Sequence, residues 1–256
     1  MDEWRKITDD PNEARVVGAR QAALARARGA GLLADRVDYL CERARGKRVL
    51  DIGVVDHRLR AAGGPGWLHG RLCEVAAECE GVDVLPGEIA ELQRRGFSVS
   101  CFDVAEARLP RTFDVIVCGD VLEHIDEPGP FLTHCGEMLT EEGVLILTLP
   151  NPWYLNVIIK ALFGRQVFQE NVDHVAWYDP GTLYELADRC GLDLVGYAGV
   201  RVRSAKGLAG RVFFRLLGAG GFGLRREVLA KTMVYELRRK RVQGERAGAR
   251  ADARHK

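Results

Sequence analysis

Several features that would place this chain in a simple class are missing from its sequence. It has no apolar run of the roughly 18 residues that a membrane-spanning helix needs, and its first residues hold no apolar stretch typical of a secretory signal. Its formal net charge is only +1, which provides no global field to attract nucleic acid or an anionic membrane. We therefore predict a cytoplasmic protein with no specific nucleic-acid partner and at most peripheral contact with a membrane.

The cysteines also lack a recognisable pattern. The chain has seven of them, an odd number, and none forms a Cys-x-x-Cys pair. Cys101 and Cys118 lie in apolar stretches, where cysteine usually behaves as a small hydrophobic residue. This distribution predicts reduced thiols rather than a disulfide framework, and we expect no metal site.

The most informative stretch that is present covers residues 47–53, Lys-Arg-Val-Leu-Asp-Ile-Gly. Its nearly continuous apolar run is typical of a central parallel strand that is covered on both faces. Asp51 lies near the carboxyl end, where open α/β sheets bind their ligands, and Gly53 lets the chain turn close to a ligand.

The same pattern returns three times along the chain. Residues 81–84, 99–103 and 113–120 are apolar stretches that end at or near Asp83, Asp103 and Asp120. The spacing of about thirty residues between Asp51 and Asp83 suits a strand–helix–strand unit, and an acid in that position suits a ribose diol. The loop after the first strand lacks the G-x-G-x-x-G phosphate cradle, which disfavours a nicotinamide dehydrogenase.

These four ordered motifs, over about residues 45–200, resemble the class I S-adenosylmethionine-dependent methyltransferases, especially the branch of ubiquinone-biosynthesis and sugar methyltransferases. The resemblance implies a doubly wound, Rossmann-like α/β fold, with a seven-stranded sheet of order 3-2-1-4-5-7-6 and an antiparallel seventh strand. It also implies S-adenosyl-L-methionine as the cofactor. Asp83, with Val84, would bind the ribose hydroxyls, and Asp103 and the backbone of Val104 would bind the adenine.

The loop after the first strand departs from the family. Asp51, Gly53 and Val55 occupy positions that would hold the methionine moiety, but the family has glycines where this chain has Val55 and His57. A catalytically silent partner protein that only binds S-adenosylmethionine therefore stays open. Variants of this loop also occur in a subgroup that accompanies glycan biosynthesis.

Two histidines are the candidate catalytic groups. By resemblance, the backbone at Asp120 and Val121 would flank the sulfonium, which places His124 near the transferred methyl. His174 precedes Trp177 and Tyr178 in a loop that would orient a saccharide. An imidazole suits the removal of a hydroxyl proton at neutral pH, although His124 could equally hydrogen-bond a loop.

We expect residues 1–45 to form an N-terminal helical segment, which lies across the cofactor pocket in some relatives, and residues 46–238 to form the methyltransferase domain. That domain would contain an amphipathic, glycine-rich insert at 203–227, and 239–256 would be a basic disordered tail. A turn is predicted at 141–143. His69 and Arg71 would meet the cofactor carboxylate or lie in solvent. The other predicted helices are 13–34, 35–45, 67–80, 87–95, 128–139, 153–163 and 181–190, and the remaining strands are 144–149, 192–200 and 229–237.

The predicted function is methyl transfer from S-adenosylmethionine to a small molecule or saccharide, with oxygen favoured over nitrogen as the acceptor atom. Such a reaction mainly needs donor and acceptor held in line, together with a base. An RNA methyltransferase is a further alternative that rests on the basic tail alone.

Overall fold

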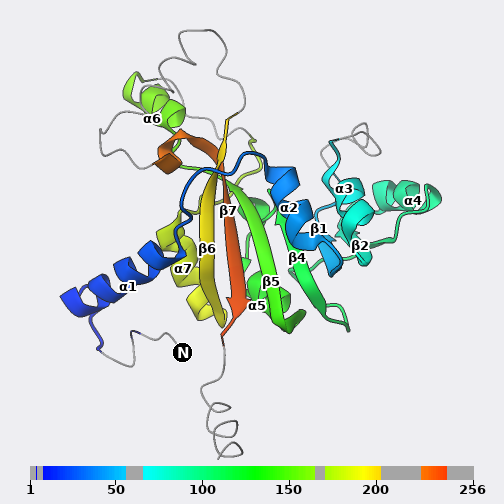
Figure 1. The fold of residues 1–256 in the computed structure, drawn as a ribbon, viewed down its shortest axis with the longest axis horizontal. Helices are drawn as coiled ribbons and strands as arrows, with labels where there is room; N and C mark the ends of the chain where they lie inside the picture. Colours follow the sequence, from blue (N-terminus) through cyan, green and yellow to red (C-terminus); the bar gives the residue numbers. More distant parts are fainter. Residues whose placement is uncertain (1–3, 5–7, 56–65, 165–170, 203–225, 241–256) are drawn as a thin grey trace, which may run out of the picture.

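The computed structural model describes residues 4, 8–55, 66–164, 171–202 and 226–240. The described part has a seven-stranded sheet of order β3-β2-β1-β4-β5-β7-β6, with helices on both faces (Figure 1). All pairs are parallel except those of β7, which runs antiparallel to β5 and β6. The predicted fold class and strand order are confirmed. The strands are β1 (Arg48–Ile52), β2 (Glu78–Asp83), β3 (Val99–Cys101), β4 (Phe113–Gly119), β5 (Leu139–Pro150), β6 (Leu192–Arg201) and β7 (Ala230–Arg239).

The helices connect these strands and cover the sheet. Asp35 and Asp179 begin their helices by accepting the backbone N–H groups of Asp38 and Thr182. Proline occupies the first turn of the helix after Asp179 and of two others, where its missing N–H costs nothing. The α-helices are α1 (Ala14–Ala27), α2 (Arg36–Ala44), α3 (Leu68–Val75), α4 (Pro86–Arg94), α5 (Pro128–Glu137), α6 (Leu155–Leu162) and α7 (Pro180–Arg189), and the short 3₁₀ helices are η3 (Leu122–His124) and η4 (Arg226–Leu229).

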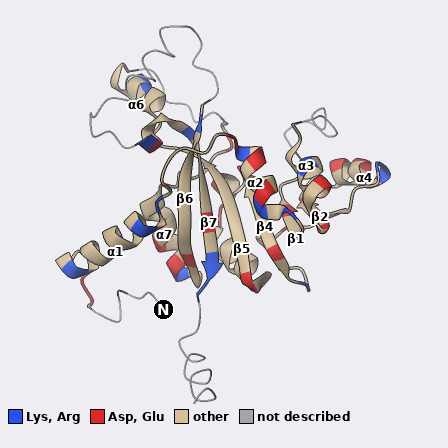
Figure 2. Cartoon of the chain, in the orientation of Figure 1, with Lys and Arg blue, Asp and Glu red and all other residues tan. Residues whose placement is uncertain are grey.

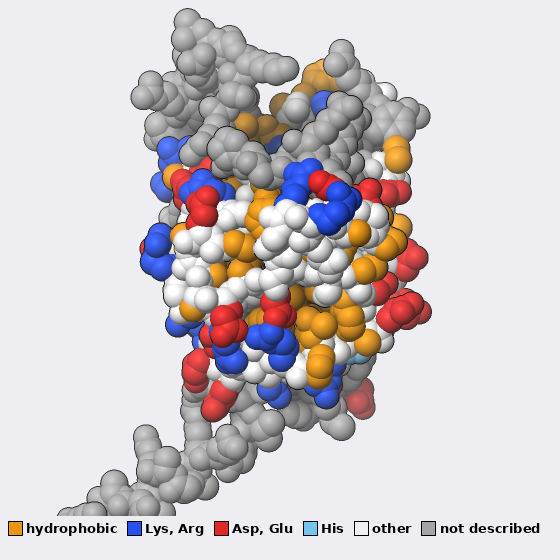
Figure 3. Space-filling model, turned by 90° about the vertical axis from the view of Figure 1, so that its right-hand side faces the viewer, with side chains coloured by type: hydrophobic (Ala, Val, Ile, Leu, Met, Phe, Trp, Pro, Cys, Tyr) orange, Lys and Arg blue, Asp and Glu red, His pale blue; other side chains and the backbone are white. Residues whose placement is uncertain are grey.

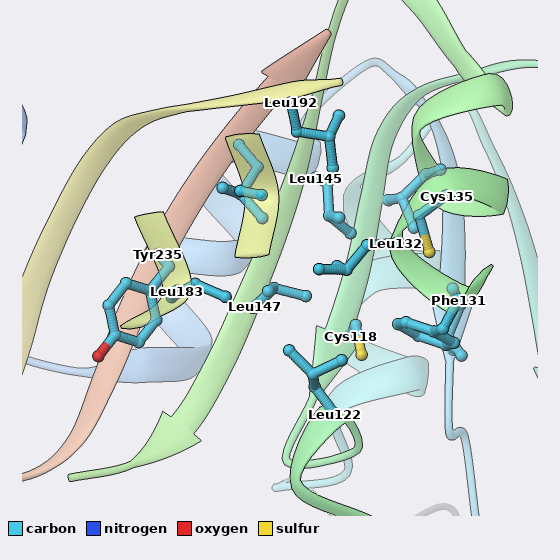
Figure 4. Packing of buried hydrophobic residues seen from close by; sticks show 14 of the residues in the cluster. Cys118, Leu122, Phe131, Leu132, Cys135, Leu145, Leu147, Leu183, Leu192 and Tyr235 are labelled. Carbon is cyan, nitrogen blue, oxygen red and sulfur yellow. The ribbon is translucent and has the colours of Figure 1, made fainter. Parts of the chain in front are cut away.

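Two cores lie on opposite faces of the sheet because successive strand residues point in opposite directions. On one face, Ile116 and Cys118 pack with Phe131 and Leu132 of α5, as Figure 4 shows for Cys118 and the two α5 side chains. On the other face, residues such as Val117 pack against α2 and α3. Truncating a buried side chain such as Leu132 to alanine would cost about 2–5 kcal/mol.

The N-terminal segment covers the edge of the sheet formed by β6. Single bridges join Arg28 to Tyr197 and Leu33 to Val200, so the chain after α1 runs along an otherwise open strand. In Figure 1, α1 lies on the β6 side of the molecule, away from β1 and β2. Ordinary packing on the sheet therefore describes α1 better than a lid over the first strands.

Three predictions of element boundaries were wrong. The helix predicted for 13–34 ends at Ala27, because Arg28 and Leu33 bridge β6. The helix predicted for 67–80 ends at Val75, and β2 begins at Glu78 because that residue pairs with Arg48 of β1. The predicted turn at 141–143 lies inside β5, where it forms an irregularity in the pairing with β4. Pairing with a neighbouring strand overrides local propensity at Glu78, whereas residues 141–143 bulge out of the pairing between Leu139 and Val144.

Charged side chains lie mostly on the helices and near the ends of the strands (Figure 2). On the face at the right of Figure 1, acidic and basic side chains alternate without a patch of one sign (Figure 3). Across the described residues, no helix has the length and apolar character needed to span a bilayer. The loop with His57, most of the predicted insert and nearly all of the predicted tail lie outside the described residues.

Candidate active site

The four predicted acids follow neighbouring strands and lie along one edge of the sheet. Asp51 is in β1, Asp83 ends β2, Asp103 follows β3 and Asp120 follows β4. Because these strands are parallel, their carboxyl ends share an edge. The four acids therefore form a row in the order Asp103, Asp83, Asp51 and Asp120, which follows the strand order and not the sequence.

Gly53 meets Val121 where two loops cross this edge. The backbone at Gly53 has φ of +81°, a conformation that L side chains rarely adopt. A Cβ built there would also lie 2.4 Å from Cγ2 of Val121. Both observations explain glycine at this position, and they place the two predicted cofactor loops in contact.

The loop that departs from the family is held by two hydrogen bonds. The indole of Trp67 donates to the carbonyl of Val54 over 3.0 Å, and the N–H of Val55 donates to Oδ2 of Asp83 over 2.9 Å. Val54 is buried, while Val55 is half-buried. The chain therefore turns toward Asp83 through a backbone donor, without the glycine expected at position 55.

Asp83 and Asp103 have carboxylates that are organised by local backbone donors. The N–H of Leu85 donates to Oδ1 of Asp83 over 3.2 Å, and Ala105 donates to Oδ1 of Asp103 over 2.8 Å. Burial raises the pKa of Asp83, against the backbone hydrogen bonds that lower it. A carboxylate has about four lone-pair directions, so Asp83 retains capacity for two hydroxyl donors. Val84, next along the chain, is exposed.

Asp120 has an unusual backbone and a fixed side chain. Among the described residues it is the non-glycine residue with positive φ, 55°, which aspartate tolerates better than most residues. Its carboxylate accepts from Arg36 of α2 and, over 3.3 Å, from the hydroxyl of Thr148. Arg36 therefore ties the N-terminal segment to the edge of the sheet, a role that the sequence did not suggest.

Asp51 is engaged inside the protein. It is only 2% exposed, and its Oδ2 lies 3.1 Å from Nδ1 of His69, which is completely buried. Burial lowers the pKa of His69, but hydrogen bonds with Asp51 and Cys73 outweigh it and raise that pKa to about 9. His69 is thus not a solvated first-turn residue. Arg71 is paired with Glu74 of the same helix, at 3.3 Å. In this arrangement His69 is bonded to Asp51 and Arg71 to Glu74.

The two candidate catalytic histidines meet at a buried glutamate. The rings of His124 and His174 pack edge to face, with centroids 4.6 Å apart and planes at 84°. Nε2 of His174 lies 3.9 Å from Oε1 of Glu123. The N–H groups of Val175 and Ala176 donate to the carbonyl of Glu123, over 2.9 and 3.3 Å, which holds the two loops together.

Glu123 is the residue of this site that the sequence interpretation missed. It is 1% exposed, and neither carboxylate oxygen has a hydrogen-bond partner among the described residues. Burial raises its pKa to about 8, and the charge of Asp120 adds to that effect. The available signal was an acid directly beside His124, immediately after a strand that ends in an acid.

A cavity of about 830 Å³ lies among α1, the end of β5, the start of α7, β6 and β7, and Glu123, His124 and His174 are not among its lining residues. Trp153, Asp179 and Tyr197 are part of its lining, and the indole N–H of Trp153 donates to Oδ2 of Asp179 over 3.1 Å. Residues 174–179 connect this cavity to the two histidines, and the charge of Glu123 acts together with burial to raise the pKa of Tyr178.

Comparison with known proteins agrees with this geometry. Residues 24–196 match the sequence profile of a methyltransferase domain family. A ubiquinone biosynthesis O-methyltransferase from Neisseria meningitidis serogroup C is 26% identical over 175 residues, which cover 64% of this chain and 72% of that protein. One from Vibrio cholerae (strain O395) is 26% identical over 180 residues, covering 64% and 70%.

Solved structures share the fold. The magnesium protoporphyrin IX methyltransferase from Synechocystis PCC 6803 with bound SAH superposes with a TM-score of 0.51 at 17% identity, and each chain is covered to 93%. An Archaeoglobus fulgidus SAM-dependent methyltransferase gives 0.51 at 18% identity, covering 93% of this chain and 100% of that one.

The sheet order and the row of acids define a class I methyltransferase fold with a nucleoside-binding edge. The chain belongs to the S-adenosylmethionine-dependent methyltransferase family. The residues present fit that cofactor, because backbone N–H groups of Val55 and Leu85 hold the Asp83 carboxylate in place at the carboxyl end of β2. The assignment of individual residues to parts of the cofactor stays a prediction.

Proposed function

We propose that this methyltransferase transfers a methyl group to a hydroxyl oxygen of a small molecule or saccharide. The observation that carries the proposal is the cluster of Glu123, His124 and His174 at the edge of the sheet, two residues beyond the Val121–Gly53 contact. A hydroxyl oxygen must lose its proton to a base as it attacks the methyl carbon. The binding residues hold donor and acceptor in line for that attack.

S-adenosylmethionine supplies an electrophilic methyl on a sulfonium when it is bound. Asp83 and Asp103 hold its ribose and adenine, while Asp51, Gly53, Val55 and the backbone at Asp120 and Val121 surround the rest. These residues bind and orient. Their role predicts changes in cofactor affinity rather than in proton transfer.

His124 takes the proton of the acceptor hydroxyl. Both histidines are half-buried residues, and we assign the proton to His124 because it follows Val121, which contacts Gly53. His174 packs against His124 and lies 3.9 Å from Glu123. Glu123, whose pKa burial raises to about 8, can exchange a proton near neutral pH, and in its ionised form it would stabilise a charged His174 at 3.9 Å.

The cavity beside Trp153 receives the acceptor. Its volume falls within the range of small-molecule sites, and its lining combines aromatic rings with the side chains of Asn151 and Asp179. Aromatic faces and hydrogen-bonding groups together suit a saccharide or a phenol. The relatives named as O-methyltransferases also favour oxygen as the acceptor atom.

The test uses the full chain with a methyl-labelled donor and a panel of phenols, saccharides, amines and RNA. We expect label in the phenol or saccharide fraction, in an ether bond identified by mass spectrometry and NMR. Label only in amines or RNA would overturn the proposal. Equilibrium binding of the donor, measured alongside by calorimetry, separates a failure of binding from a wrong acceptor class.

A further inference from the structure

A second cluster of chemically reactive side chains lies beneath α3, away from the two histidines of the active site. His69 and Cys73 are four residues apart on this helix and therefore share one face, and Cys79 is in β2. The three ligand-type atoms of these side chains all lie within 4.8 Å of one another. The helix ends at Val75, so helical spacing does not bring Cys79 to His69 and Cys73. The packing of α3 on β2 does.

We propose that His69, Cys73 and Cys79 form a binding site for one thiophilic divalent cation, with Zn²⁺ as its natural occupant. Zinc binds sulfur at about 2.3 Å and imidazole nitrogen at about 2.0–2.1 Å in a tetrahedron, which separates such a pair of ligands by roughly 3.5 Å. Nε2 of His69 lies 3.5 Å from Sγ of Cys73. Two thiolates and one imidazole are a donor set that prefers zinc over magnesium or calcium.

The surroundings of His69 match those of a metal ligand. Metal-bound histidines generally donate their other ring N–H to a carboxylate, which fixes the tautomer and orients the ring. Nδ1 of His69 faces Oδ2 of Asp51 at 3.1 Å, which leaves Nε2 directed toward Cys73. The ring is further held by Trp67 and Phe97, with centroids 5.3 and 6.0 Å away.

An ion can reach this site. Cys73 and Cys79 are both partly exposed, although His69 is completely buried. Among the described residues the cluster supplies three ligands, so a water molecule would complete the tetrahedron. The site would clamp α3 to β2 and, through His69, hold Asp51 in place.

The experiment starts from the full chain, reduced and freed of metal by a chelator. Zn²⁺ is titrated in competition with a chromophoric chelator, and Co²⁺ serves as a spectroscopic probe. We expect one Zn²⁺ per chain, a thiolate-to-cobalt charge-transfer band and a higher unfolding temperature with Zn²⁺. Because the cobalt spectrum is recorded on the wild-type chain, it does not depend on any variant folding.

Cys73→Ser and Cys79→Ser should each weaken Zn²⁺ binding by at least about 100-fold and remove the charge-transfer band, by analogy with metal-site substitutions. Cys190→Ser is the matched control, since Cys190 is also partly exposed but lies after α7. It should leave binding unchanged. Glu123→Gln should do the same, which separates this site from the Glu123 cluster.

Three outcomes would overturn the proposal. The reduced chain shows no cobalt–thiolate band, or Zn²⁺ binding survives in the Cys73→Ser, Cys79→Ser double variant. In the third, Cys73 and Cys79 form a disulfide in air while the reduced chain binds no Zn²⁺, which would make the pair a redox element.

Discussion

The molecule contains two buried acid–histidine pairs that differ in how their charge is compensated. Asp51 lies 3.1 Å from His69, in a pocket closed by Trp67. Glu123 lies 3.9 Å from His174, and neither of its oxygens has a hydrogen-bond partner among the described residues. Both acids are almost fully buried.

The difference shows in the direction of the pKa shifts. In the metal-free protein, hydrogen bonds with Asp51 and Cys73 raise the pKa of His69 to about 9, which favours a charged imidazole beside the carboxylate. At the other pair, burial raises the pKa of the acid itself to about 8. A compensated pair is typical of structural support, whereas an acid held near neutrality is typical of a site that exchanges protons.

The largest expected effect comes from removing the base at the second pair. His124→Ala should lower turnover about 10²–10⁴-fold, the usual contribution of general-base catalysis, without weakening cofactor binding. His174→Ala should raise the acceptor KM more than it lowers kcat. Steady-state kinetics and calorimetry on both variants check this. If His124→Ala keeps nearly normal turnover and His174→Ala abolishes it, the two roles are exchanged.

The next effect concerns stability. The folded-state pKa of Glu123 is raised above its usual 4.5 to about 8, so the folded protein binds the additional proton between those values. Stability from this group is therefore fully present below about pH 4.5 and is lost as the pH rises through about 8. Glu123→Gln removes the ionisation and should make the protein more stable than wild type at pH 9, by an amount on the order of 3 kcal/mol.

Urea unfolding at pH 5, 7 and 9 measures this difference. Glu106→Gln, which changes an exposed carboxyl, is the control and should leave the pH dependence as it is. A Glu123→Gln variant that loses stability at pH 9 would show that the carboxylate is ionised and paired.

A smaller effect is expected at the cofactor edge. Asp83→Ala removes the acceptor for the N–H groups of Val55 and Leu85 as well as for the ribose hydroxyls. The cost should be about 1–3 kcal/mol of cofactor binding, measured by calorimetry. Asp103→Ala should weaken binding as well, and an unchanged affinity there would refute its adenine role.

The smallest effect is predicted for the loop that departs from the family. Val55 already donates its N–H to Asp83, so Val55→Gly adds no hydrogen bond. The substitution increases the conformational entropy of the unfolded chain, which slightly destabilises the folded loop. Cofactor affinity should stay equal or fall slightly in a binding titration. A clear gain would instead mean that the valine side chain obstructs the site.

Much of the fold could be predicted because it depends on short patterns. The apolar stretch before Gly53 predicted the central strand, and the repeated strand-end acids predicted the edge where a ligand binds. Predicted boundaries were wrong where a neighbouring strand determines the structure. Residues 76–80 suit a helix, yet pairing with Arg48 makes Glu78 the start of a strand.

The candidate site divides in the same way. His124 and His174 were predicted separately, but their contact depends on hydrogen bonds from Val175 and Ala176 to the carbonyl of Glu123. The grouping of His69 with Cys73 and Cys79 likewise had no signal beyond scattered cysteines. Spacing along one helix can be read from the sequence, whereas contact across a crossover cannot.

By itself, the sequence determined the central strands and the acids at their ends, because these depend on hydrophobic periodicity and on the position of each acid. Its resemblance to a known family supplied the order of the strands, which the structure confirms. The tertiary structure alone decided which acids are compensated. Whether a buried carboxylate holds a structural contact or a mobile proton depends on the few ångströms between it and the residues packed around it, here 3.1 Å at Asp51 and 3.9 Å at Glu123.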